Sequence, residues 1–223
     1  MTSLVFNAIP FIALAIALVI SAILFSRSKG LAIFALIWFG TAFGLAQAPD
    51  YPHFAGLDPE KLRTMVQSSF MFIPVGLYFW FRGRGGQVQA TIESISTPVL
   101  AATQVYRLSG AVLIFGYVAG QLPAHLAYTS GVIDIFIGLT AIPLALALRG
   151  SKPGFVAISW STIGILDFVL AFTIVFVAMY EFASIEPDPT AIGRWPHSII
   201  SLFQVPLAII IHAEILRRAF AKL

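Results

Sequence analysis

The sequence predicts an all-α membrane protein with seven transmembrane helices, forming a single domain over residues 1–223. Of the 223 residues, 59% are hydrophobic and 10% are charged, and the mean hydropathy is +0.92. This leaves too little polar surface to coat a soluble globule. Apolar runs long enough to cross a bilayer recur along the chain, and basic residues collect at alternate ends of these runs.

The seven predicted spans are separated by short polar segments. Proline- and glycine-rich stretches interrupt the apolar runs, because proline removes a backbone donor and both residues favour turns. The polar stretch 85–96 reads as a loop between the third and fourth spans. The spans cover residues 4–25, 31–47, 62–81, 97–121, 124–148, 155–182 and 196–216.

The start of the fourth span decides whether Arg107 lies inside the membrane. Thr97 followed by Pro98 is typical of a helix N-terminus. A helix starting only at Ser109 would keep roughly 14 residues, or about 21 Å, which is too short for a hydrocarbon core about 30 Å thick. We therefore expect the helix to start near Thr97 and to carry Arg107 across the bilayer.

The distribution of basic residues predicts the orientation. Nine of them fall on one side of the seven spans and three on the other, leaving Arg107 aside, so the positive-inside rule places the N-terminus outside and the C-terminus in the cytoplasm. We expect the plasma (inner) membrane. The first group is Arg27, Lys29, Arg82, Arg84, Arg149, Lys152, Arg217, Arg218 and Lys222, and the second is Lys61, Arg63 and Arg194.

A weak internal repeat is compatible with a 3+1+3 parallel arrangement. Residues 28–30 with Gly40 recur as residues 151–154 with Gly164, and residues 69–74 resemble residues 201–206. Spans one to three would then match spans five to seven, as in some transporters built from parallel repeats. Chance recurrence of glycine and proline in apolar sequence is the alternative.

A carboxylate lies near the middle of the fifth span. Small or hydroxylated residues share the helical face of Asp134, namely Ser130, Gly131, Gly138 and Ala141. Asp134 should therefore point toward other helices. Since an isolated charge is costly in hydrocarbon, this acid should be protonated, paired or functional.

Two other charged residues fall at the same depth. At 1.5 Å per residue, Arg107, Asp134 and Asp167 all lie within about one helical turn of the membrane midplane. Opposite charges attract strongly in a low dielectric, so we expect Arg107 to pair with Asp134 or Asp167. The alternatives are that Arg107 snorkels to the cytoplasmic interface, or that the cluster serves helix packing alone.

Two acids against one arginine leave one carboxylate with no obvious partner, which suits proton coupling or recognition of a polar solute. We expect Gln104, Trp160 and Gln204, with Gln67 as a further candidate, to reach a common cavity with the cluster. These observations favour a small transporter or channel for a polar or ionic solute. Its expected partners are the lipid bilayer and that solute, without nucleic acid, and a homo-oligomer is compatible with the sequence.

The alternative is an intramembrane metal- or haem-dependent enzyme or redox protein using outer-face histidines. His53, His125 and His197 fall on the outer side, but their spacing matches no metal motif, so no metal ligand or cofactor is predicted. His212 and Glu214, two residues apart, do not share a helix face and should not form a dyad. Retinal binding is excluded, because no lysine lies within a span.

Overall fold

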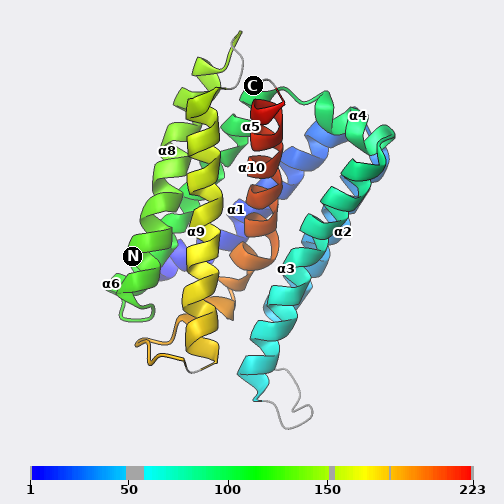
Figure 1. The fold of residues 1–223 in the computed structure, drawn as a ribbon. Helices are drawn as coiled ribbons and strands as arrows, with labels where there is room; N and C mark the ends of the chain where they lie inside the picture. Colours follow the sequence, from blue (N-terminus) through cyan, green and yellow to red (C-terminus); the bar gives the residue numbers. More distant parts are fainter. Residues whose placement is uncertain (1, 49–57, 151–153, 181, 222–223) are drawn as a thin grey trace. The chain divides into compact units, whose positions relative to one another are not determined.

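The computed structural model describes residues 2–48, 58–150, 154–180 and 182–221, with the side chains of residues 2–6 left out. These residues form helices, turns and loops, without a strand among them (Figure 1). They include seven helices that are long and apolar enough to cross a membrane. Apart from its first two residues, the chain divides into two compact units, unit 1 (3–94 and 190–207) and unit 2 (95–189 and 208–223).

The first three spans belong to unit 1 and have side-chain caps where the sequence supplies them. The spans are α1 (Thr2–Phe25), α2 (Lys29–Gln47) and α3 (Pro59–Arg84). Ser28 caps α2 by accepting a hydrogen bond from the backbone N–H of Leu31, at 3.4 Å. Asp58 caps α3 through the N–H of Glu60 at 2.8 Å. Helix α3 is therefore longer at both ends than the predicted span 62–81.

The loop predicted for residues 85–96 is wrong in part, because α4 (Gln87–Glu93) lies within it. Gly85 and Gly86 take positive φ angles of 74° and 81°, which break the backbone after α3 and allow a new helix to begin. Glu93 accepts a hydrogen bond from Arg82 at 2.9 Å and holds the short helix against the end of α3. A short polar helix has no apolar periodicity, so the pattern that marks spans does not detect it.

Unit 1 also contains the π-helical segment η4 (Ile200–Gln204), which precedes the last helix, α10 (Val205–Phe220). The Trp38 indole N–H donates to the carbonyl of Leu202 at 3.2 Å, and its ring lies 5.0 Å from that of Phe203. Ser198 donates to the carbonyl of Ala46 at 3.2 Å. These bonds join α2 to the segment that leads into α10.

Unit 2 contains the fourth, fifth and sixth spans and the later part of α10. The fourth span runs over Thr97–Val118, and the fifth over Ala124–Ala147, so the predicted start at Thr97 is confirmed. Helices α8 and α9 run side by side (Figure 1). The elements are α5 (Thr97–Thr103), the 3₁₀ segment η1 (Gln104–Gly110), α6 (Ala111–Val118), α7 (Ala124–Leu126), the π-helical segment η2 (Ala127–Gly131), α8 (Val132–Ala147) and α9 (Phe155–Met179).

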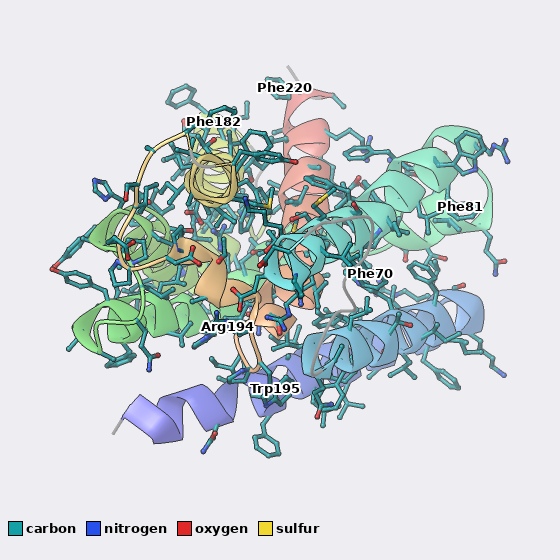
Figure 2. The ribbon with its side chains drawn as sticks, turned by 90° about the horizontal axis from the view of Figure 1, so that it is seen from below. Phe70, Phe81, Phe182, Arg194, Trp195 and Phe220 are labelled. Atoms are coloured by element: carbon teal, nitrogen blue, oxygen red, sulfur yellow. The ribbon has the colours of Figure 1, made fainter. Side chains whose placement is uncertain are left out.

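Large apolar side chains are exposed in both units. Phe81 of α3, Phe182 after α9 and Phe220 of α10 are all exposed (Figure 2). Soluble proteins rarely expose many large apolar side chains on their helices. The outer faces of the spans therefore suit contact with lipid, as expected for a membrane protein.

Candidate functional site

The candidate site is built around Arg107, which lies in η1, where the fourth span tightens from α to 3₁₀ geometry. The Arg107 side chain is 2% exposed, and Gln104 and Tyr106 of the same segment are also buried. A 3₁₀ stretch in the middle of a helix often marks a functional or strained position. The predicted location of Arg107 within the fourth span is confirmed.

Asp134 lies in the first turn of α8, directly after η2. It is buried together with Ser130, Gly131, Gly138 and Ala141, while Leu139 on the opposite face is exposed, which confirms the predicted small-residue face. Two glycines bring η1 against this face. A Cβ at Gly138 would lie 2.7 Å from the backbone nitrogen of Leu108, and one at Gly110 would overlap Asp134.

Asp167 lies on the buried face of α9. This face repeats at helical spacing, and the Asp167 side chain on it is 0% exposed. The mixture of small and polar residues lets α9 approach the other elements of unit 2 closely. The buried residues of the face are Ala157, Trp160, Ser161, Gly164, Asp167 and Phe168.

A single guanidinium joins the two acids. Arg107 Nε donates to Oδ1 of Asp134 at 2.5 Å, and Arg107 Nη2 donates to Oδ2 of Asp167. The expectation of a pair with Asp134 or Asp167 is therefore exceeded, because Arg107 binds both acids. The expectation that one carboxylate lacks a partner is wrong, since the planar guanidinium presents donors to two acceptors at once.

The remaining guanidinium nitrogen contacts a histidine that the sequence did not assign to the cluster. Arg107 Nη1 lies 3.0 Å from Nε2 of His212 and donates to the carbonyl of Gly164 at 3.3 Å. The guanidinium also stacks over the ring of Phe168, 4.4 Å from its centroid. We call Arg107, Asp134, Asp167 and His212 the charged cluster.

The inward-facing position of His212 could have been predicted from the residue pattern of α10. It is 0% exposed and shares a buried helical face with Ala208, Ile215 and Ala219. Such a small and apolar face predicts that a histidine on it points into the protein. Residue spacing relates His212 only to Glu214, which faces elsewhere, and gives no link to Arg107.

The other predicted site residues are distributed over both units. Gln104 is buried three residues before Arg107. Trp160 donates to Thr140 Oγ1 at 2.8 Å, and its ring centroid lies 4.9 Å from that of His212, so it borders the charged cluster. Gln204 and Gln67 are buried in unit 1. A cavity that all of these residues share stays a prediction.

A third buried acid, Glu214, is bound by two arginines near the end of α10. Glu214 is 1% exposed and accepts hydrogen bonds from Arg217 at 2.8 Å and Arg218 at 2.6 Å. Arg218 also donates to the carbonyl of Ile95 at 2.5 Å, which ties α10 to the start of α5. This acid therefore has a structural role that is separate from the charged cluster.

The histidines that were predicted on the outer side form no metal centre within the described part of the chain. His125 is exposed on α7 in unit 2, and His197 is buried in unit 1, where burial lowers the pKa of its imidazole. His53 lies outside the described residues. Among those that are described, no three histidine, cysteine, aspartate or glutamate side chains are grouped closely enough to hold a metal ion.

Chemically, the charged cluster can bind and release a proton or a small cation. Arg107 supplies one positive charge, and two aspartates can supply two negative charges. All four side chains of the cluster are buried. A site of this kind in the middle of membrane spans is typical of ion and solute pathways.

A family model described as a domain of unknown function (DUF8737) matches residues 63–220. This range covers more than half of the chain, so the chain belongs to that family. The range includes all four residues of the charged cluster. No curated protein and no solved structure matches the chain.

Proposed function

We propose that this member of the DUF8737 family is a small membrane transporter or channel for a polar or ionic solute, and that the charged cluster is its binding site. The observation that carries the proposal is the engagement of two buried aspartates by one buried arginine within three apolar spans. Charged groups at such positions are costly, and in membrane proteins they mark pathways for ions and polar solutes.

Irregular helix geometry beside the cluster supports the same function. Arg107 lies within the 3₁₀ segment η1, and the π-helical segment η2 ends three residues before Asp134. Segments of both kinds are frequent at functional sites and change geometry more readily than regular α-helix. Pro143 lies inside α8, the helix that carries Asp134, and Pro74 lies inside α3; proline kinks are common in membrane helices.

The proposal includes an orientation and a location. Nine basic residues against three favour a cytoplasmic C-terminus and an outer N-terminus in the plasma (inner) membrane. The 3+1+3 parallel repeat belongs to the same proposal. It rests on the recurrence of residues 28–30 within 151–154 and on the resemblance of residues 69–74 to residues 201–206. The lipid bilayer and the solute are the proposed partners.

Transport is tested with purified protein in liposomes. Uptake of radiolabelled sodium ion, tetraethylammonium, sulfate and glucose is measured with a pH gradient imposed in either direction. We expect wild-type protein to accelerate uptake of at least one probe over protein-free liposomes. Asp134→Asn should abolish this acceleration, because it removes one of the two acids that Arg107 binds.

The matched control is Glu214→Gln, which neutralises a buried acid of the same unit outside the charged cluster. Provided that it folds, this variant should transport like the wild type. Equal uptake by wild type, Asp134→Asn and protein-free liposomes would instead favour a cluster that only holds helices together.

A further inference from the structure

The two aspartates bind two neighbouring nitrogens of one guanidinium. Nε and Nη2 of arginine lie on the same side of the planar group, and a single carboxylate usually accepts from both through its two oxygens. In this protein Asp134 supplies one oxygen, to Nε, and Asp167 supplies the other, to Nη2. The two carboxylates are therefore neighbours around one guanidinium.

Two ionised carboxylates in such proximity repel each other, and the charged cluster would then carry a net charge of −1 in a buried setting. One arginine contributes +1 and two aspartates contribute −2. Both effects are removed by a single bound proton, because neighbouring carboxylates that share a site hold one proton between them.

Two other titratable groups among the described residues of unit 2 lie next to Arg107, and neither takes this proton. His212 lies with Nε2 toward Arg107, and since arginine only donates, Nε2 must accept and the imidazole is neutral. Tyr106, buried in η1 beside Arg107, is neutral as a phenol and adds no charge. His125, the titratable residue of α7, is exposed.

We propose that Asp134 and Asp167 hold one exchangeable proton between them. The positive charge of Arg107 balances the carboxylate that stays ionised, so the pair binds one proton and not two. The proposal deepens the proposed function by naming the ion to which transport is coupled. The proton is a property of the resting protein, so it can be measured without any solute. A failure to detect transport would leave the proton count standing.

The experiment is infrared difference spectroscopy of the purified protein near neutral pH, which counts protonated carboxyl groups through their carbonyl stretch. The expected count equals the number of cluster aspartates minus the number of cluster arginines. Wild type should show one protonated carboxyl. Asp134→Asn and Asp167→Asn should each show none, because the remaining acid is then balanced by Arg107.

Changing the arginine should move the count in the opposite direction. Arg107→Gln should show two protonated carboxyls, and Arg107→Gln combined with Asp167→Asn should show one. Arg107→Lys keeps the charge and should retain one, which keeps the test informative if Arg107→Gln does not fold. Glu214→Gln, outside the cluster, should leave the count at one.

Two results would overturn the inference. The first is a wild-type spectrum without a protonated carboxyl in the cluster, which would mean that both acids stay ionised. The second is a protonated carboxyl that persists in Asp134→Asn or in Asp167→Asn, which would mean that the proton belongs to one residue independently of its neighbour and of Arg107.

Discussion

Gly164 of α9 lies so close to the imidazole of His212 that a Cβ at position 164 would overlap the ring. The same Cβ would lie 3.0 Å from Nη1 of Arg107. The absence of a side chain here lets α9 approach both residues, and the carbonyl of Gly164 accepts a hydrogen bond from Arg107. This glycine therefore positions the arginine and the histidine together.

Gly164→Ala should destabilise the protein by about 1 to 3 kcal/mol, because the added methyl overpacks a buried site. Thermal unfolding in detergent measures the change. Gly76→Ala in α3 is the matched control, since a Cβ there meets nothing within 4 Å. Alanine is a better helix former than glycine, so the control should be neutral or stabilising by up to about 1 kcal/mol. Equal effects of the two substitutions would contradict the packing argument.

Removing one partner of the charged cluster should destabilise strongly and non-additively. Arg107→Gln should cost about 3 to 5 kcal/mol, because it removes the shared partner of two buried acids. Asp134→Asn should cost about 1.5 to 3 kcal/mol, because it removes a hydrogen bond to a charged group while Asp167 stays balanced by Arg107. The double variant should lose less than the sum. A double-mutant cycle from reversible unfolding gives the coupling, and strict additivity would rule out the pair.

The sequence predicted the spans and the three charges well, because both rest on strong physical constraints. A bilayer demands about 20 apolar residues per helix, and a charge inside such a run is rare enough to stand out. Arg107, Asp134 and Asp167 could therefore be placed at one depth from helix lengths alone. That one guanidinium binds both acids depends on side-chain geometry, which residue spacing does not determine.

His212 and the irregular segments were missed for different reasons. A histidine on an apolar face can be a core residue or a site residue, and the choice depends on which helix lies opposite. The 3₁₀ segment η1 and the π-helical segment η2 have no sequence signature, since they arise from the packing of neighbouring helices. Helix α4 was missed because it is short and polar.

Glu214→Gln should loosen the end of α10. Its carboxylate accepts hydrogen bonds from Arg217 and Arg218, and each hydrogen bond to a charged group contributes about 1.5 to 3 kcal/mol. Loss of the charge should lower the unfolding temperature measurably. Glu93→Gln is the control, because its ion pair with Arg82 is exposed on the Glu93 side and such pairs contribute about 0 to 1 kcal/mol. Similar losses for both variants would argue against a buried structural acid.

The orientation can be tested with single cysteines, since the natural chain has none. Ser94 and Gln121 are both exposed and flank the fourth span on opposite sides. In intact cells, a membrane-impermeant maleimide should label Gln121→Cys and leave Ser94→Cys unlabelled until the membrane is opened. The reverse pattern would invert the topology, and labelling of both positions in intact cells would contradict a span between them.

The buried His197 should make the protein less stable in mild acid. Burial lowers the pKa of this imidazole, while the unfolded chain keeps a value near 6.5. Below pH 6.5 the unfolded state therefore binds more protons than the folded state, so stability is fully present above this pH and falls as pH decreases toward the lowered pKa. The loss amounts to about 1.4 kcal/mol for each pH unit between the two pKa values.

The measurement is the unfolding temperature from pH 7.5 down to about pH 5. This temperature should fall less in His197→Gln than in wild type. The control is His125→Gln, which removes an exposed imidazole and should follow the wild type. Identical pH profiles for wild type and His197→Gln would show that this histidine does not contribute to the acid sensitivity.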